Sequence, residues 1–599
     1  MYNIYIKNKL YVLYSKKKEM GKNIFLWLSI IVFVACDKDE TSIPMETMDE
    51  QFKVYLLQNF DLNHDGVIDI KEAALVTEID VNGLSISSFD GIGYFPNLAK
   101  LVCANNHAIT TLDLKEVPNL KILDCTFSWL QAIDVSHNTN LKVLDCGFCR
   151  IEELDVSNNH ALETLSCISY NNRLTSLKIN PELKVLDIQY HGMALLDFSG
   201  NQHLKELTCG GENLIHLDIS RSVLEVLNCG NFSKLASINL EGCTTLRKLN
   251  CSASPDLSNC RSLEELEVSN VNSLDVSHCP LLKKLHCSSS HLIRLDLTNN
   301  PALTDFKLSY AAIDEIDFGN KSQLVNFEMD YSSIYSNIDL SNCKALQSVS
   351  INNYYYYSNP NFEEITLSGC TSLENVIIES ARIKSLIVKG CTALSSINCP
   401  YNQLTGLDLE GCSNLVSLNC SWNQLTELDI EDCTKLTDLI CNNNNLTSFI
   451  TNSDNISFIN CAQNNLIEIN VLNRSKLKEL ICDGNKIASL DLSGCISLEV
   501  LTCNNNTLLN ALNIKDCISL KNLNCQNCLL TSLDVTHCTG LTALDCSRNS
   551  LQPSLDVSKN TALSSLDCRN NMLNELIVKR NNSIQSLQID PGTQIVFVD

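Results

Sequence analysis

Apolar and polar residues alternate in two short stretches of a unit that repeats along most of the chain. In one copy, Leu418 and Cys420 alternate with polar neighbours, and Leu428 and Ile430 lie on either side of Asp429. Alternation with a period of two is typical of a strand with one buried face. Each unit is therefore predicted to form two short strands. Because the unit recurs about every 21 residues, the strands are expected to stack into a solenoid.

The apolar position at the end of the first strand is a cysteine in most units. Aliphatic residues or methionine take the same position elsewhere, so the position needs an apolar side chain and not a thiol as such. Both sets together predict about 25 coils. The cysteines are Cys103, Cys125, Cys146, Cys167, Cys209, Cys229, Cys251, Cys287, Cys399, Cys420, Cys441, Cys461, Cys482, Cys503, Cys525, Cys546 and Cys568. The other occupants are Val81, Ile188, Val268, Leu308, Met329, Ile351, Ile378 and Ile589.

Three positions after this cysteine, many units have an asparagine, such as Asn423. A buried amide there is expected to bond the backbone of its own coil and of the neighbouring coils. The unit LxxLxCxxNxL resembles the leucine-rich repeat, in which leucine stands where this chain has cysteine. The resemblance implies a leucine-rich repeat solenoid over residues 78–599, mostly β and built from parallel strands, with about 25 coils of about 21 residues.

The repeat spacing breaks in two places. The coil after Cys251 is short, because residues 252–256 lack the usual arm that contains asparagine and leucine. The coil after Ile351 is long, and its extra residues include four consecutive tyrosines, Tyr354 to Tyr357. An insertion in a repeat protein is expected to form a loop, often on the binding face.

A second series of cysteines lies three positions before the leucine that opens each coil. Asparagine takes the same place in other coils, so a small group that donates to a turn carbonyl is expected there, a role that a thiol partly fills. Stacked strands lie about 4.8 Å apart, whereas a disulfide needs Cβ atoms about 3.8 Å apart. We therefore interpret the cysteines as buried free thiols; a disulfide framework, a metal array and a Cys146–Cys149 redox pair are the alternatives. The series is Cys243, Cys260, Cys279, Cys343, Cys370, Cys391, Cys412, Cys433, Cys495, Cys517 and Cys538, and the asparagines are Asn138, Asn159, Asn201, Asn300 and Asn560.

The N-terminal region contains an apolar run over residues 24–35, preceded by Lys22. This run is too short for a membrane span and is typical of the core of a secretory signal. Residues 1–35 are therefore predicted to be a signal peptide, with Met20 as a candidate true start. The run ends at Cys36 in the sequence Phe-Val-Ala-Cys, which resembles the processing box of bacterial lipoproteins.

In that resemblance, Cys36 becomes the lipid-modified first residue. The acidic stretch that follows, residues 37–40, resembles the surface-export signal of Bacteroidetes lipoproteins. Residues 36–47 are then expected to form a lipidated tether. The resemblance to internalin-like bacterial surface lipoproteins implies a lipid-anchored protein on the cell surface, in the outer membrane. An ordinary signal peptide with an incidental cysteine is the alternative.

A 12-residue segment beginning at Asp61 carries oxygen ligands at every position that an EF-hand or dockerin-type calcium loop uses. Gly66 permits the sharp turn, and Ile68 is expected to anchor the loop to the core. Apolar residues at helical spacing precede the loop, and a second short helix is expected after it. We therefore expect bound Ca²⁺ in a helical cap over residues 48–77, which covers the first hydrophobic edge of the solenoid. The predicted ligands are Asp61, Asn63, Asp65, Val67, Asp69 and Glu72.

The formal net charge is −25, so nucleic acids and anionic membranes are not expected partners, because they require a basic surface. Part of this acidity is an aspartate that precedes the apolar residue of the second strand in coil after coil. We interpret these carboxylates as acceptors of backbone or hydroxyl hydrogen bonds at turns, with calcium bridging between coils as the alternative. The series is Asp113, Asp134, Asp155, Asp218, Asp275, Asp296, Asp317, Asp339, Asp408, Asp429, Asp491, Asp534 and Asp556.

Aromatic residues recur two positions after the cysteine position, where the strand face should meet its exposed rim. Exposed aromatic rings on a rigid surface suit either sugar stacking or protein contacts, and scattered surface aromatics are the alternative. The tentative ligand-binding residues are Phe127, Phe148, Tyr190, Tyr310, Tyr331, Tyr401 and Trp422.

No enzyme motif is evident, since the histidines form no spaced cluster and neither GxSxG, HExxH nor a phosphate-binding glycine loop occurs. We therefore expect a monomeric, non-enzymatic surface protein, an adhesin or interaction scaffold that binds host or bacterial proteins. The alternative is a surface lipoprotein that binds glycans through the aromatic row. Membrane contact is expected only through the N-terminal lipid.

Overall fold

The structure is a computed structural model of the chain. The predicted signal peptide, the predicted lipidation site Cys36 and the four tyrosines from Tyr354 lie outside its described residues. These described residues are 42–169, 171–230, 234–353, 363–582 and 584–599.

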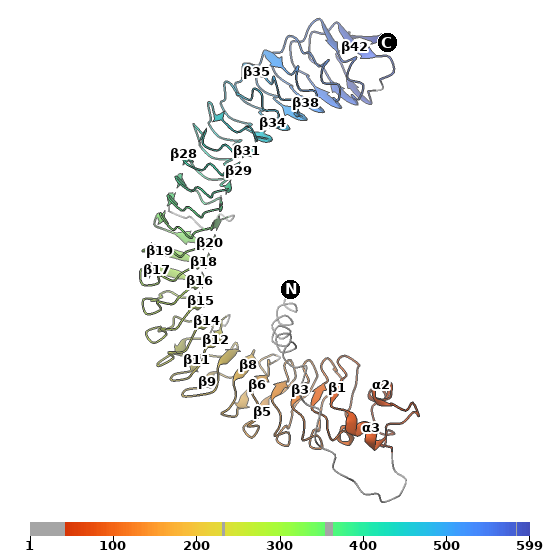
Figure 1. Ribbon diagram of the computed structural model, residues 1–599, viewed down its shortest axis with the longest axis vertical. Coiled ribbons are helices and arrows are strands. Elements are labelled where there is room, and N and C mark those ends of the chain that lie inside the picture. Colours follow the sequence, from red (N-terminus) through yellow and green to blue (C-terminus); the bar gives the residue numbers. More distant parts are fainter. Residues whose placement is uncertain (1–41, 170, 231–233, 354–362, 583) are drawn as a thin grey trace, which may run out of the picture.

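The chain winds into a long curved solenoid whose concave side carries one parallel sheet of 25 strands (Figure 1). Each coil contributes one strand, so the predicted leucine-rich repeat architecture and coil number are confirmed. The strands are β1 (Glu78–Asp80), β2 (Lys100–Val102), β3 (Ile122–Asp124), β4 (Val143–Asp145), β6 (Thr164–Ser166), β8 (Val185–Gln189), β10 (Glu206–Gly210), β12 (Val226–Cys229), β14 (Lys248–Cys251), β15 (Glu265–Ser269), β16 (Lys284–Ser288), β18 (Asp305–Ser309), β20 (Asn326–Asp330), β23 (Ser348–Asn352), β25 (Asn375–Glu379), β27 (Ser396–Asn398), β29 (Ser417–Asn419), β31 (Asp438–Ile440), β33 (Phe458–Asn460), β34 (Glu479–Ile481), β36 (Val500–Thr502), β38 (Asn522–Asn524), β39 (Ala543–Asp545), β41 (Ser565–Asp567) and β43 (Ser586–Gln588).

The second strand of the repeat forms short parallel sheets on the outer side of the arc. These sheets are interrupted, so the outer side is less regular than the concave one. They comprise β5 (Glu153–Asp155) with β7 (Ser176–Lys178); β9 (Leu195–Asp197), β11 (His216–Asp218) and β13 (Ser237–Asn239); β17 (His291–Asp296), β19 (Ala312–Asp317) and β21 (Ser333–Ile334); β22 (Ile338–Asp339), β24 (Glu364–Thr366), β26 (Ser385–Ile387) and β28 (Gly406–Asp408); β30 (Asp429–Ile430) with β32 (Ile450–Thr451); β35 (Ser489–Asp491) with β37 (Ala511–Asn513); and β40 (Ser554–Asp556), β42 (Glu575–Lys579) and β44 (Gln594–Val598).

Both cysteine series point into the core that lies between the two layers. All thirty cysteines of the described residues are buried, and none of these is in a disulfide. Burial withdraws the thiol from water and raises its pKa, to about 12 at Cys420 and Cys287. The interior position predicted for both series is therefore confirmed.

The asparagine three positions after the strand cysteine ties successive coils together, as predicted. Asn423 Nδ2 donates to the carbonyls of Cys399 at 2.9 Å and Cys420 at 3.1 Å, and its Oδ1 accepts from the amide of Leu404 at 3.0 Å. Cys149 and Cys528, which belong to neither series, take this position in their own coils. Their thiols donate to the carbonyls of Cys125 and Cys503, at 3.2 and 3.4 Å.

The second cysteine series donates to turn carbonyls in the same way. Cys391 Sγ lies 3.2 Å from the carbonyl oxygen of Leu367, and Asn300 at the equivalent place donates to the carbonyls of Val276 and Cys279. Lys321 occupies this place in one coil, and its Nζ donates to the carbonyl of Leu297 at 2.6 Å. The position thus selects a hydrogen-bond donor, which explains why thiol, amide and amine exchange there.

The N-terminal cap contains two helices, α2 (Glu50–Phe60) and α3 (Ile70–Leu75), followed by the 3-10 turn η1 (Ile92–Tyr94). Phe52 and Leu56 of α2 and Ile68 of the loop between the helices are fully buried against the first coils. The described part of the chain contains no helix both long enough and apolar enough to cross a bilayer.

The cap begins earlier in the chain than expected. Ser42 forms an antiparallel bridge with Asp69, the Ile43 amide donates to the Ile68 carbonyl at 2.8 Å, and Ile43 and Met45 are buried. Residues 42–47 therefore pack against the cap instead of forming part of a free polar tether, because their apolar side chains find a partner in the loop.

Candidate binding face and calcium loop

The seven aromatic residues singled out from the sequence all lie directly after strands of the concave sheet, where the backbone turns outward. Each of them has a left-handed conformation, with φ between 49° and 58°. This conformation costs an L-residue about 1–2 kcal/mol, and asparagine tolerates it better than a bulky side chain does. Asparagine holds the same place in other coils, at Asn105, Asn443, Asn505, Asn527 and Asn570.

Six of these aromatic residues form three stacked pairs across adjacent coils. The ring centroids are 4.5 Å apart for Phe127–Phe148, 5.0 Å for Tyr310–Tyr331 and 5.6 Å for Tyr401–Trp422. The planes are within 18° of parallel in every pair. Tyr190 lies at the equivalent position of its own coil and is 37% exposed. The predicted row thus includes three stacked ring pairs at separate places along the solenoid.

One contact beside the first pair was not predicted from the sequence. The guanidinium of Arg150 lies 4.2 Å from the ring centre of Trp129, which is 46% exposed. Both residues lie four positions after the cysteine of their coil, so the register that located the aromatic row would also have located this contact.

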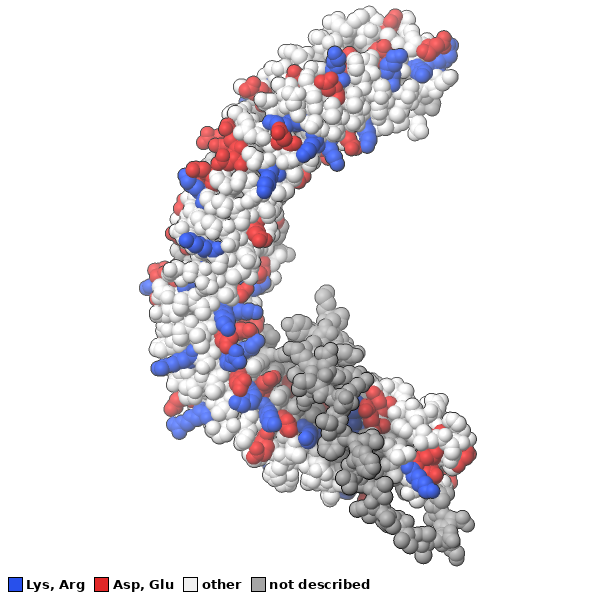
Figure 2. Space-filling model, viewed as in Figure 1, with Lys and Arg blue, Asp and Glu red and all other residues white. Residues whose placement is uncertain are grey.

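The concave sheet carries alternating charge over its N-terminal and middle coils. Figure 2 shows side chains of both signs gathered on the lower part of the arc. Ion pairs join strands of adjacent coils, for example Lys307 Nζ to Glu328 Oε2 at 2.8 Å and Lys248 Nζ to Glu265 Oε2 at 3.0 Å. Burial and the charge of neighbouring Asp124 raise the pKa of Asp145 to about 7. From β27 to β33 the same surface is almost free of charge, with Asp438 as the exception.

The predicted calcium loop lies between α2 and α3, and Gly66 takes the left-handed turn at φ 87°. Asp61 Oδ2 accepts from the Gly66 amide at 2.9 Å, and Glu72 accepts from the amides of Leu62 at 2.8 Å and Asp69 at 2.9 Å. Glu72 and Asp69 also form a capping box at the start of α3.

The donors of this loop fit a hard cation, because all six are oxygen atoms on a short helix–loop–helix segment. Over the described residues, no three side chains of His, Cys, Asp or Glu are gathered to hold a metal ion. The predicted calcium ligands also include two oxygen atoms from outside those four side-chain types, the Asn63 amide oxygen and the Val67 carbonyl oxygen.

The aspartate series accepts hydrogen bonds at the outer turns, as predicted. In each coil, Oδ1 accepts from the amide two residues later, for example Asp491 from Ser493 at 3.0 Å and Asp317 from Gly319 at 2.9 Å. The Ser493 hydroxyl donates to the same carboxylate at 2.6 Å and is the main reason why the pKa of Asp491 is lowered.

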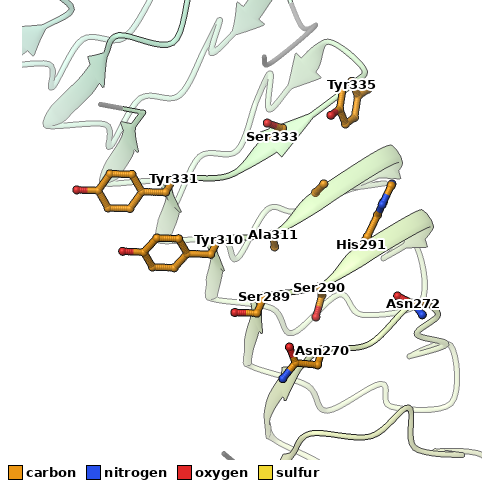
Figure 3. A pocket seen from close by; sticks show the side chains of 11 residues that line it. Asn270, Asn272, Ser289, Ser290, His291, Tyr310, Ala311, Tyr331, Ser333 and Tyr335 are labelled. Carbon is orange, nitrogen blue, oxygen red and sulfur yellow. The ribbon is translucent and has the colours of Figure 1, made fainter. Parts of the chain in front are cut away.

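A shallow groove of about 470 Å³ lies beside the Tyr310–Tyr331 pair (Figure 3). The sequence did not predict this groove. Its far wall consists of His291, the first residue of the outer strand β17, and Tyr335, which follows β21. The outer strands begin earlier in these coils than in others, so the repeat consensus did not place the two side chains opposite the tyrosine pair.

Comparison of the sequence with protein-family models and with curated proteins gives no match. Among solved structures, the chain is similar to the functional domain of InlJ from Listeria monocytogenes, described as including a cysteine ladder, with 20% identity, 88% of this chain and 75% of that chain covered, and a TM-score of 0.30. It is also similar to YopM from Yersinia enterocolitica, with 23% identity, 76% and 88% covered, and a TM-score of 0.45.

Proposed function

We propose that this protein is an exported scaffold that binds a protein partner on the concave sheet. The observation that carries the proposal is the alternating charge on the strands from Glu163 to Asp330. Exposed ion pairs contribute only about 0–1 kcal/mol of stability, so folding does not account for so many of them. Patterned charge does give partner selectivity and faster association.

Site-specific photocrosslinking on intact cells tests this proposal. A photoreactive residue replaces His286 on the concave sheet or, as the control, Glu315 on the outer strand β19. The expected result is a discrete protein adduct from position 286 that disappears when Lys307→Glu is added. Equal adducts from both positions, or none from position 286, would contradict the proposal.

The second part of the proposal concerns localisation: a lipid on Cys36 holds the protein at the cell surface. The support is the short apolar run that ends in the lipoprotein-like processing box. Cys36→Ser should move the protein from the membrane fraction to the soluble one and abolish metabolic labelling with a fatty acid. Unchanged labelling would contradict lipidation at this residue.

The third part is structural calcium in the cap. Asp61, Asn63, Asp65, Val67, Asp69 and Glu72 would hold the ion, whose positive charge would attract the four carboxylates of the loop. Millimolar Ca²⁺ should raise the melting temperature and slow proteolysis near Ser42, since residues 42–43 pair with the loop. Glu72→Gln should remove both effects and Glu50→Gln, on exposed α2 surface, should preserve them; a melting temperature that Ca²⁺ leaves unchanged would contradict this part.

A second candidate function is the capture of glycans by the aromatic row. The observation that favours it is the left-handed backbone of all seven aromatic residues. Strain of this kind persists where the surrounding structure enforces it, and it clusters at ligand-binding sites. Binding of polysaccharide by the purified chain, and its loss on Tyr401→Ala and Trp422→Ala or on changes at another pair, tests this function.

A further inference from the structure

The groove beside Tyr310 and Tyr331 is bounded by side chains from four consecutive coils (Figure 3). One wall follows the ends of the concave strands β15, β16, β18 and β20. The opposite wall begins at His291 of β17 and ends at Tyr335, just after β21. With coils spaced about 4.8 Å apart, four coils span about 14 Å along the solenoid. The groove therefore accepts an elongated ligand and not a single small ring.

Aromatic rings stand on both walls of this groove. Tyr310 is 65% exposed and Tyr335 41% exposed. Tyr310 stacks on Tyr331 with an interplanar angle of 14°. The two stacked tyrosines keep the left-handed backbone at φ 52° and 49°, at a position where asparagine would be less strained. In Figure 3 the rings of Tyr310 and Tyr331 extend side by side from one edge of the groove, and the ring of Tyr335 stands at the other edge.

The floor of the groove is kept low by small residues and direct backbone pairing. The amide of Ala312 donates to the carbonyl of Ser290 at 2.7 Å, and that of Ser333 donates to Ala311 at 2.9 Å. Ser290 and Ala311 are buried, so no long side chain fills the groove. The floor is part of the packed coil and is formed before any ligand binds.

The lining is polar but carries almost no charge. Asn270, Asn272 and Ser289 add exposed amides and a hydroxyl. The one titratable side chain besides the tyrosines is His291, whose Nε2 lies 3.2 Å from Asp314 Oδ1. A charged ligand would find no opposite charge here, and an alkyl chain would leave the amides without partners.

We infer that this groove binds a neutral carbohydrate chain lying along the solenoid axis. A sugar ring has an apolar face that packs on tyrosine rings and a rim of hydroxyls that exchange hydrogen bonds with amides and hydroxyls. The groove offers both, and in it the ligand needs no formal charge. The inference rests on the second candidate function, glycan capture, and locates it in residues 270–335.

Affinity electrophoresis of the full chain in gels containing one polysaccharide each tests the inference. The neutral probes are mixed-linkage β-glucan, arabinoxylan, α-mannan and dextran; heparin and polygalacturonate are the charged probes. At least one neutral probe should retard the protein. Tyr310→Asn and Tyr335→Ala should each weaken that retardation at least tenfold, without lowering the melting temperature. Tyr94→Ala, which removes an exposed tyrosine of the N-terminal cap outside the groove, should leave it unchanged.

The possible results distinguish a wrong location of the binding site from the absence of glycan binding. Retardation that survives Tyr310→Asn and Tyr335→Ala but is lost in Tyr401→Asn would overturn the groove and leave glycan capture standing. Retardation by the charged probes alone would overturn the neutral ligand. Retardation by no probe would overturn both the groove and the second candidate function. Asparagine at position 310 suits the left-handed turn, so a failure to fold does not obscure the result.

Discussion

Different hydrogen bonds join successive coils in two stretches of the solenoid. In residues 396–571, here the regular array, a buried asparagine in nearly every coil bonds the carbonyls of two coils. In residues 252–353, the central segment, this asparagine is mostly absent. There β17, β19 and β21 extend toward the concave sheet, and backbone pairs such as Ser333 with Ala311 join the coils.

The difference has a consequence for surface chemistry. An amide that ties coils together fixes the arm of the repeat in one shape, and the groove at Tyr310 and a second one lined by residues 177–201 both lie outside the regular array. Backbone pairing frees the side chain at this position, so it can be as small as Ala311. A departure from the repeat consensus therefore leaves space for a surface groove without exposing the core.

The largest expected difference between the two regions is in the stability that each loses at alkaline pH. The regular array holds fifteen cysteines and the central segment four. An unfolded thiol has a pKa of about 8.5, whereas burial raises that of Cys412 and Cys433 to about 12. Because the folded pKa is raised, stabilisation is complete below pH of about 8.5 and is lost from there toward 12, by about 1.4 kcal/mol per thiol and pH unit.

The pKa shift of Lys321 in the central segment changes stability with pH in the opposite direction. Burial lowers its pKa, so the folded state gains stability as the pH rises toward the ordinary lysine value. Limited proteolysis with an alkaline-stable protease at pH 10, mapped by mass spectrometry, should first cut within residues 396–571. First cuts within 252–353 would show that thiol burial does not set the local stability.

The next effect in size is the loss of one ladder amide. Asn444→Ala leaves the amide of Leu425 without its partner and removes one of the two side-chain amides that donate to the carbonyls of Cys420 and of Cys441. The expected cost is about 3 kcal/mol of unfolding free energy, from one desolvated amide left unpaired and two hydrogen bonds lost. Ser332→Ala in the central segment should cost about 1 kcal/mol, because its coil keeps the backbone pairs.

Denaturant unfolding of the two variants measures this contrast. The exposed Asn510→Ala is the matched control and should change stability by less than about 0.5 kcal/mol. Equal losses at Asn444 and Ser332 would mean that backbone pairing does not replace the amide ladder.

A smaller effect distinguishes the two cysteine series near the start of the array. Cys391 donates to the Leu367 carbonyl at 3.2 Å, so Cys391→Ser keeps a donor in place and should cost less than about 1 kcal/mol. Cys399 belongs to the strand series and is fully buried among apolar side chains. Cys399→Ser should cost about 2 kcal/mol, because its hydroxyl is buried where a nonpolar group is needed. Melting temperatures at pH 7 measure both, and the reverse order would contradict the separate roles of the series.

The sequence predicted the parts of this structure that repeat. Period-two alternation located both strands of a coil, and the exchange of cysteine with Val, Ile, Leu and Met located the core position. The exchange of cysteine with Asn138 and Asn300 identified a donor, which the carbonyl contacts bear out. These inferences succeeded because many copies of one unit sample the residues that a single environment tolerates.

The parts that depend on departures from the repeat were not predictable in the same way. The groove arises because the arm near Ala311 pairs through its backbone, and no consensus position encodes that change. The packing of Ile43 on the loop between α2 and α3 joins a predicted tether to a predicted cap, and nothing in the spacing of either segment indicates the contact. The stacking of Tyr310 on Tyr331, by contrast, follows from equal register in adjacent coils.

The smallest expected effect concerns the left-handed turn that both regions share. Asn527 takes this turn at φ 55° in the regular array, where its neighbours at the same position are Asn505 and Arg548. Asn527→Tyr should lower the unfolding free energy by about 1 kcal/mol, because the ring gains backbone strain and has no aromatic partner. Tyr310→Asn should change it by less than about 0.5 kcal/mol, because relief of strain and loss of a stacked pair oppose each other. Denaturant unfolding of both variants decides the point: equal losses would show that stacking alone, and not a compromise with backbone strain, keeps tyrosine in the central segment.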